Sequence, residues 1–318
     1  MPCFTPLDAW RTTESTPNGR KISFERSENT TTKIQLPCGQ CIGCKLDRSL
    51  VWAIRCVHEA QLHDQNSFIT LTYSPQHVPW DGSLRKSDFQ AFIKRLRYHF
   101  SERKINPETG RYKRYPTRAV RYYMCGEYGE SLKRPHYHAC LFGIDFPDKE
   151  PLSKKDDQIL WRSATLETLW GKGHTSIGAV TFESAAYIAR YITKKITGDQ
   201  SHEHYETTCK HTGNLISLLP EYTCMSLKPG IAAEWFTKYK SEIYPSDFAI
   251  HRGRKIKLPR YYDKLAELSG IDVEIIKKKR KEFARLHRAN NTPERLAVRE
   301  KIQKRKYKQL IRSLENDT

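Results

Sequence analysis

The sequence contains no run of about 20 apolar residues, the length that a membrane-spanning helix requires, and this excludes an integral membrane protein. Its amino terminus has neither a basic segment nor an apolar segment, so we expect no cleaved secretion signal. It also lacks a glycine-rich phosphate loop, because Gly171-Lys172-Gly173 is too short to form one. The chain therefore shows no ATP-driven helicase module.

Positive charge is abundant: 55 Lys and Arg face 36 Asp and Glu in 318 residues, a net charge of +19. A surplus of this size favours a polyanionic partner, most often a nucleic acid. Residues 271–318 hold 15 basic and 7 acidic residues and are expected to form helices over 273–289 and 293–314. This basic tail is either a solvated helical surface or an arm that follows a phosphate backbone.

Ahead of the tail, the hydrophobic pattern alternates between strands and helices after a turn-rich start at residues 1–37. A loop rich in glycine joins two of the expected strands, which favours an antiparallel hairpin and an α+β fold over a parallel, doubly wound sheet. The strands are expected at 68–73, 119–125, 136–142 and 176–181, and the helices at 46–63, 87–100, 156–170 and 183–196. We divide the chain into an N-terminal segment with a cysteine cluster and a helix, a core, an accessory segment packed on the core, and the basic helical tail, at residues 1–63, 64–200, 201–270 and 271–318.

Two histidines open an apolar strand at His136 and His138. Side chains two residues apart on a strand share a face, so both imidazoles can reach one ion. The hairpin would bring Glu127 beside them, which gives two nitrogens and a carboxylate with open coordination positions. Such a set suits a catalytic divalent ion that contacts phosphate, and the alternative is a pair of half-exposed strand histidines.

Two tyrosines four residues apart, Tyr187 and Tyr191, would share one face of a helix with Lys194. A phenol with a pKa of about 10 is almost fully protonated at neutral pH, so a nucleophilic tyrosine needs help from nearby cations. The alternative is an amphipathic helix with its tyrosines at the edge of the core.

Nine cysteines, an odd number, favour thiols or metal ligands over a disulfide framework. Cys38, Cys41 and Cys44 are spaced as in a metal knuckle, and glycines between them allow tight turns. An iron–sulfur cluster would need a fourth cysteine where Arg48 stands, so the pattern predicts a structural zinc ion. Its fourth ligand would be Cys3, with Cys56 or His58 as alternatives, and three unligated thiols remain the other interpretation.

The His-x-His strand followed by a Tyr-x-x-x-Tyr helix resembles the HUH endonucleases that initiate rolling-circle replication. Three longer stretches, residues 37–44, 134–140 and 181–187, more closely resemble the replication initiators of gokushovirus-type Microviridae, which are small phages with circular single-stranded DNA. Cys3 ahead of Pro6-Leu7 and the run Pro259 to Lys264 match as well. The resemblance covers residues 1 to about 265 and leaves out the basic tail.

This resemblance implies the fold of the HUH endonucleases, a small ferredoxin-like antiparallel sheet flanked by helices. It also implies an enzyme that nicks single-stranded origin DNA, forms a 5′-phosphotyrosine and a free 3′ hydroxyl, and later rejoins the circle. It implies Mg²⁺ or Mn²⁺ held by His136 and His138, with Glu127 as third ligand. Tyr187 and Tyr191 would be paired nucleophiles, with Lys194 as a catalytic cation. Further contacts with DNA are expected from Tyr73, Arg134, Arg190 and Lys195.

The expected partners are origin DNA and a host helicase and polymerase, with no membrane, in the cytoplasm of a bacterial host. Two other functions remain open at this point. One is a non-enzymatic zinc protein that binds nucleic acid. The other is an RNA-binding sheet that stacks bases on Tyr73, Tyr122 and Tyr123.

Overall fold

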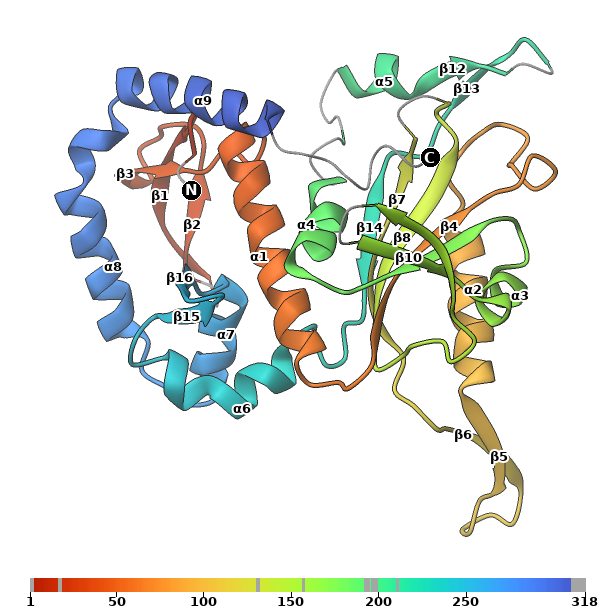
Figure 1. The fold of residues 1–318 in the computed structure, drawn as a ribbon. Helices are drawn as coiled ribbons and strands as arrows, with labels where there is room; N and C mark the ends of the chain where they lie inside the picture. The colour runs from red at the N-terminus through yellow and green to blue at the C-terminus, as the bar shows by residue number, and fades with distance from the viewer. Residues whose placement is uncertain are drawn as a thin grey trace. The chain divides into compact units, whose positions relative to one another are not determined.

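The computed structural model describes residues 3–16, 19–129, 132–155, 158–191, 195, 200–209 and 212–309. Figure 1 draws these residues as a ribbon. Within them the chain divides into two compact units. The first unit contains residues 3–48 and 274–309, and the second contains residues 49–273. Helix α1 (Ile42–Ala60) contributes residues to both. The four-part division made from the sequence separates the chain by role, and it stays a prediction.

The second unit is built on a seven-stranded sheet in which every neighbouring pair is antiparallel. Its strand order is β14 (Tyr222–Met225), β7 (Arg121–Tyr128), β8 (Pro135–Phe142), β4 (Asn66–Thr72), β11 (Thr175–Gly178), β10 (Gln158–Arg162) and β9 (Glu150–Lys155).

One face of this sheet carries the main hydrophobic core. Alternation along β4 sends Ile69 and Leu71 to this face, where they meet helix α2 (Lys86–His99) and helix α3 (Ala164–Trp170). Helix α2 turns an apolar stripe toward the sheet, as residues spaced by three and four positions do on a helix. That stripe consists of Phe89, Phe92, Ile93 and Leu96.

The opposite face of the sheet is covered over β7 and β8 by helix α4 (Phe182–Tyr191) and by the part of α1 that belongs to this unit. Trp52 of α1 stacks on Tyr123 of β7, with ring centroids 4.7 Å apart. Ser49 Oγ donates a hydrogen bond of 3.0 Å to the carbonyl of Ala186, which ties α1 to α4. This helix-covered face is the one that carries the predicted histidines.

The remaining elements of the second unit lie outside the sheet. Among them, α6 and α7 contact each other and pack on α1 through His58, whose ring stacks on Trp235. The elements are the hairpins β5 (Ser101–Ile105) with β6 (Tyr112–Pro116), β12 (Glu206–Thr208) with β13 (Leu215–Ser217) and β15 (Phe248–His251) with β16 (Arg254–Lys257), and the helices α5 (Gln200–Tyr205), α6 (Ala233–Ile243) and α7 (Arg260–Leu268).

The first unit contains a three-stranded antiparallel sheet of order β2 (Gly19–Ser23), β1 (Leu7–Thr16) and β3 (Thr30–Leu36). Its C-terminal part is helical, with α8 (Glu274–Leu286), the 3₁₀ turn η1 (Arg288–Asn291) and α9 (Pro293–Lys308). Thr292 caps α9, because its hydroxyl accepts a hydrogen bond from the backbone N–H of Arg295.

The α+β class and the antiparallel sheet predicted from the sequence are confirmed, although the sheet is larger than expected. The two helices of the tail are confirmed as far as residue 308, and residues 310–314 of the second expected helix lie outside the described residues. Two local predictions are wrong. Residues 1–37 are not merely turn-rich, because they form β1, β2 and β3. The helix expected over 156–170 begins only after Ser163, whose side chain caps α3, and residues 158–162 form strand β10 instead.

Candidate active site and metal centres

A carboxylate and two imidazoles meet on the helix-covered face of the sheet. Strands β7 and β8 pair with Glu127 opposite His136 and Cys125 opposite His138. Because alternate residues of a strand share a face, the side chains of Glu127, His136 and His138 all project to the same side. The sequence anticipated this set, and the register of the hairpin brings it together.

The three groups are in direct contact. Glu127 Oε1 lies 2.8 Å from the Nε2 atoms of both His136 and His138. The two imidazole rings meet edge to face, with centroids 4.9 Å apart. All three residues are at most 3% exposed, so bulk water is largely excluded from the cluster.

The outer nitrogens of both rings are also held. His136 Nδ1 lies 3.1 Å from the carbonyl oxygen of Arg134, and His138 Nδ1 lies 2.9 Å from Thr70 Oγ1. A carbonyl only accepts hydrogen bonds, so His136 Nδ1 carries the proton in the neutral ring and Nε2 presents a lone pair to the carboxylate. Metal-binding histidines are typically oriented by such a contact at the other ring nitrogen.

The donor set fits a divalent cation. If His136 is neutral, the lone pair of its Nε2 atom faces Glu127 Oε1 at a distance of 2.8 Å. These two electron-rich atoms repel each other unless a proton or a cation lies between them. Within the described residues, Glu127 Oε2 is buried and has no hydrogen-bond partner. Burial raises the pKa of the Glu127 carboxyl, but contacts with His136 and His138 outweigh it and leave that pKa below its ordinary value. Two nitrogens and a charged carboxylate are therefore available as ligands.

Tyr187 lies beside this cluster. Its ring meets the ring of His138 edge to face, with centroids 5.0 Å apart, and contacts Phe68 at 6.3 Å. Tyr187 is 3% exposed. The imidazoles and the first predicted nucleophile thus share one side of the sheet.

Helix α4 is fixed at its start by a reciprocal cap. The backbone N–H of Ser184 donates to Thr181 Oγ1, and the backbone N–H of Thr181 donates to Ser184 Oγ. Tyr191 ends this helix, one turn after Tyr187, but its side chain lies outside the described residues. Lys194 lies outside them altogether, and both roles stay predictions.

The predicted DNA contacts are scattered. Arg134 is half-buried and donates a 3.3 Å hydrogen bond to the carbonyl of Tyr73. Arg190 is half-buried on α4, and Lys195 is half-buried outside any helix or strand. Arg134 contacts the cluster through its backbone carbonyl, which lies 3.1 Å from His136 Nδ1, while its guanidinium group bonds to Tyr73.

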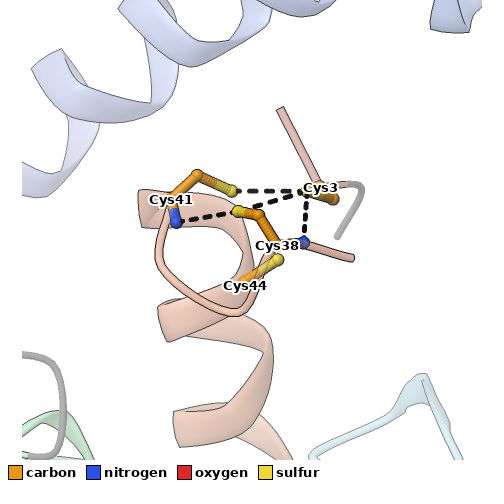
Figure 2. Close-up of side chains that lie close together, drawn as sticks. All are labelled: Cys3, Cys38, Cys41 and Cys44. Atoms are coloured by element: carbon orange, nitrogen blue, oxygen red, sulfur yellow. Dashed lines mark hydrogen bonds between the residues drawn. The ribbon is translucent and has the colours of Figure 1, made fainter. Parts of the chain in front are cut away.

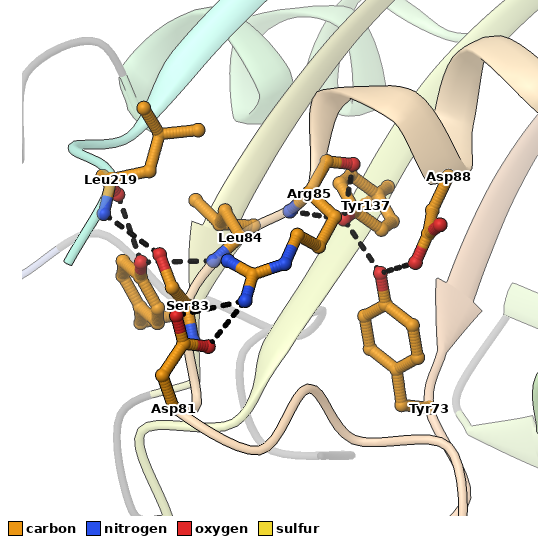
Figure 3. A network of polar contacts seen from close by, with 9 residues as sticks. Tyr73, Asp81, Ser83, Leu84, Arg85, Asp88, Tyr137 and Leu219 are labelled. Carbon is orange, nitrogen blue, oxygen red and sulfur yellow. Dashed lines mark hydrogen bonds and ion pairs between the residues drawn. The ribbon is translucent and has the colours of Figure 1, made fainter. Parts of the chain in front are cut away.

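Tyr73 does not join the site. It is fully buried on the opposite face of the sheet, where its hydroxyl donates to Asp88 Oδ2 at 2.7 Å and contacts the hydroxyl of Tyr137 at 2.8 Å (Figure 3). Its placement argues against the predicted contact with DNA. Tyr123 is also fully buried, which removes support for a sheet that stacks RNA bases on these rings.

A cavity of about 340 Å³, lined by both polar and apolar residues, adjoins His138, and the sequence analysis missed it. It extends over β4, β11, β10 and β9, beyond the part of the sheet that α4 covers. Thr70 and Thr72 pair with His138 and His136, so their hydroxyls share the face of the cluster. The alternating polar residues in Phe68-Ile69-Thr70-Leu71-Thr72 were the signal that could have revealed it.

A second cluster lies in the first unit and contains Cys3, Cys38, Cys41 and Cys44 (Figure 2). Its four sulfur atoms all lie within 4.8 Å of one another. Of the three possible fourth members named above, the structure brings Cys3 to the other cysteines. Cys56 and His58 are buried in the second unit.

The known proteins that this chain is similar to are all described as replication-associated proteins. The replication-associated protein ORF2/G2P family matches residues 66–196, the segment that contains the clustered histidines and Tyr187. The replication-associated protein ORF2 of Spiroplasma virus 4 is 32% identical over 281 residues, covering 84% of this chain and 80% of that protein. This chain belongs to that family of phage replication-associated proteins.

Two more relatives agree with this assignment. The replication-associated protein VP4 of Bdellovibrio phage phiMH2K is 32% identical over 272 residues, which cover 82% of this chain and 76% of that protein. The replication-associated protein ORF4 of Chlamydia phage 1 is 27% identical over 249 residues, covering 75% and 55% of the two chains. No solved structure gives a significant match. The phage replication family predicted from the sequence is confirmed.

In the described part of the chain, no helix is both long and apolar enough to cross a bilayer.

Proposed function

We propose that this protein starts phage DNA replication by nicking single-stranded origin DNA through a tyrosine, as a HUH-type endonuclease. The observation that carries this proposal is the meeting of two imidazoles, one carboxylate and a tyrosine ring on one face of an antiparallel sheet. Membership in a replication-associated family supports the substrate class.

His136, His138 and Glu127 would hold Mg²⁺ or Mn²⁺ with their two Nε2 atoms and their carboxylate. When bound, such an ion polarises the scissile phosphate and offsets the charge that develops on it during the reaction. The carbonyl of Arg134 and the hydroxyl of Thr70 keep the two rings oriented for this task.

Tyr187 is the proposed first nucleophile because its ring lies against His138. Its phenolic oxygen forms a bond to phosphorus and loses its proton, while the bond from phosphorus to the 3′ oxygen breaks and that oxygen takes up a proton. The products are a 5′-phosphotyrosine and a free 3′ hydroxyl. Because the phosphodiester bond energy stays in the protein–DNA ester, rejoining needs no ATP.

Tyr191 would act as the second nucleophile, since it follows Tyr187 by one turn of α4. It would cut the newly made origin after one round, and the released 3′ end would then close the displaced circle. Lys194 is proposed to favour the ionised phenol. Extension of the 3′ hydroxyl requires a host polymerase, and unwinding requires a host helicase.

The test is a denaturing gel with origin DNA labelled at its 3′ end and Mn²⁺. We expect a covalent protein–DNA band that is absent when Tyr187→Phe and Tyr191→Phe are combined. His138→Ala should also abolish the band, and Tyr239→Phe, in helix α6, should leave it unchanged. A band that persists in the double variant would overturn the assignment. Salt-sensitive DNA binding with no band from the wild-type protein would favour the non-enzymatic zinc protein instead.

A further inference from the structure

We propose that Cys3, Cys38, Cys41 and Cys44 bind one structural Zn²⁺ that holds the first unit together. Thiolates 2.3 Å from zinc in a tetrahedron lie about 3.8 Å apart. The sulfur atoms of Cys3 and Cys41 are 3.8 Å apart, and those of Cys3 and Cys38 are 3.5 Å apart. These spacings leave room for one zinc ion at the centre of the four.

Backbone groups around the cluster are arranged to stabilise thiolates. The N–H of Phe4 donates to Cys41 Sγ at 3.3 Å, and the N–H of Cys38 donates to Cys3 Sγ at 3.2 Å. Cys38 Sγ accepts from the backbone N–H of Cys41 at 3.2 Å. The cluster also lies at the N-terminus of α1, where the helix dipole favours negative charge.

Two further features of the chain fit this arrangement. The Thr5 hydroxyl donates a hydrogen bond of 3.2 Å to Cys38 Sγ. Gly39 adopts a φ of 75°, which lets the chain turn between Cys38 and Cys41.

The first unit also needs such a crosslink because its core is small. Its buried described residues are Phe4, Ala9, Thr12, Gly43, Ile276 and Leu296. A domain with so little buried apolar surface usually depends on a metal or on disulfides. Joining Cys3 to Cys38 through zinc closes a long loop around the three-stranded sheet.

The experiment uses the full-length protein as purified. Metal analysis should find one zinc ion per chain, and mercurial titration should release it as four thiols react. Cobalt substitution should give the visible bands of a tetrahedral tetrathiolate site. A chain without zinc, an iron–sulfur spectrum, or zinc release that does not follow the thiols would each overturn the proposal.

Variants identify the ligands. Cys3→Ser should lower the affinity for zinc by at least about tenfold. Removing a group that only orients a metal ligand already costs about this much, and Cys3 is a proposed ligand itself. Cys224→Ser, in strand β14, is the matched control and should keep a full equivalent of zinc. Unchanged cobalt bands in Cys3→Ser would remove Cys3 from the site. Because cobalt binding is read on the wild type as well, a variant that fails to fold does not block the test.

A separate observation points to a second DNA contact, on the hairpin of β5 and β6, which we call the basic ribbon (residues 101–118). It extends from the end of α2 (Figure 1), and its strands pair with each other and with no other described strand. Its charged residues are mostly cations, and they are Arg103, Lys104, Arg111, Lys113, Arg114, Arg118, Glu102 and Glu108.

Cations face cations across this ribbon. Arg103 pairs with Arg114, and Lys104 pairs with Lys113. Like charges directly opposite each other destabilise a strand pair, so the isolated ribbon carries a repulsion that a polyanion would relieve. Two of the guanidinium groups lie over tyrosine rings, Arg103 over Tyr112 at 4.4 Å and Arg114 over Tyr98 at 3.6 Å.

We infer that the basic ribbon binds double-stranded origin DNA, an inference that rests on the proposed function. A two-stranded β-ribbon fits the major groove, and exposed cations on both of its faces can reach phosphates. Combining Arg103→Gln and Lys113→Gln removes one cation from each facing pair. Lys238→Gln with Lys264→Gln, exposed on α6 and α7, is the matched control.

With origin duplex, the ribbon variant should bind more weakly. Its slope of log affinity against log salt should fall by about 1.8, because each phosphate that a cation neutralises adds about 0.9 to that slope. Its melting temperature should not fall, because repulsion has been removed. Formation of the covalent band on a short single-stranded oligonucleotide should be unchanged.

An unchanged slope, or an equal loss of affinity for single-stranded DNA, would overturn the inference. Failure of the proposed function would instead appear as a missing band in the wild type.

Discussion

Glu127 Oε1 lies within 2.8 Å of the Nε2 atoms of both His136 and His138, so a single carboxylate connects the two imidazoles. Changing Glu127→Gln keeps the size of the side chain and removes its charge. We expect Mn²⁺ affinity to fall by about 10- to 100-fold, because a charged oxygen ligand is replaced by a neutral amide. Isothermal titration calorimetry measures this loss. Glu150→Gln changes an exposed carboxylate on β9 and should have no effect, and equal affinities in all three proteins would remove Glu127 from the ligand set.

Tyr73 offers the opposite case, a residue whose role is structural. Tyr73→Phe leaves Asp88 and Tyr137 without the hydroxyl that they share (Figure 3). The free energy of unfolding should fall by about 1–3 kcal/mol, the usual effect of leaving buried polar groups unsatisfied. Urea unfolding measures this change. Nicking should persist at the wild-type rate, and a variant of full stability that no longer nicks DNA would restore Tyr73 as a DNA contact.

The site could be predicted from the sequence only where the alternation of side chains along the strands showed which face each residue occupies. His136, His138 and Glu127 could be placed together because a short hairpin leaves few possible registers. Tyr73 was expected to contact DNA, but it follows Thr72 along the chain and is buried in the core with Ile69 and Leu71. The pairing of β4 with β8 puts Thr70 and Thr72 on the side of the histidines.

At the scale of elements, helix α4 positions Tyr187, and its reciprocal cap fixes where the helix begins. Ser184→Ala removes one half of this cap, at a cost of about 1 kcal/mol in stability. Because a small displacement of a reacting group slows chemistry strongly, the single-turnover nicking rate should fall by up to about 100-fold with DNA affinity unchanged. Thr292→Ala removes a cap from α9 and serves as the control. Equal nicking rates in the two variants would contradict a positioning role for the α4 cap.

Elements with a buried face were predicted well, and elements without one were not. Strand β8 is buried along its whole length, and its apolar pattern was recognisable. Strand β1 buries only Ala9 and Thr12, with Trp10 half-buried and its other residues exposed, so no hydrophobic period marked it as a strand. Strand β10 was taken for the start of a helix, although Trp161 alternates toward the core while its neighbours do not.

At the scale of the whole molecule, distant segments combine in ways that no local pattern reveals. Residues 3–48 form a unit with residues 274–309, and this pairing of chain ends could not be predicted from motifs. Within the second unit, α1 meets α6 and α7 through His58, which stacks on Trp235 and bonds with the Tyr262 hydroxyl at 2.8 Å. Burial lowers the pKa of His58 from 6.5 to about 3.

This buried histidine makes stability sensitive to acid. The pKa of His58 is lower in the folded protein than in the unfolded chain, so the unfolded chain binds more protons between these two values. The contribution of neutral His58 to the free energy of unfolding is therefore fully present above pH 6.5 and is lost as the pH falls toward 3. The loss should approach about 1.4 kcal/mol per pH unit for one proton. Urea unfolding at several pH values above about 5, before most carboxylates titrate, measures it. The variant His58→Asn should show a flatter profile, and parallel profiles would contradict this origin.

Tyr187 is 3% exposed. An ester formed between this phenol and a DNA phosphate would therefore be shielded from hydrolysis by the surrounding helix and sheet. Such a linkage would persist until a 3′ hydroxyl of the growing strand arrived to attack it. The lifetime of the protein–DNA adduct would then be set by the arrival of that hydroxyl, and a protein that has nicked its template would stay attached to it and act in cis.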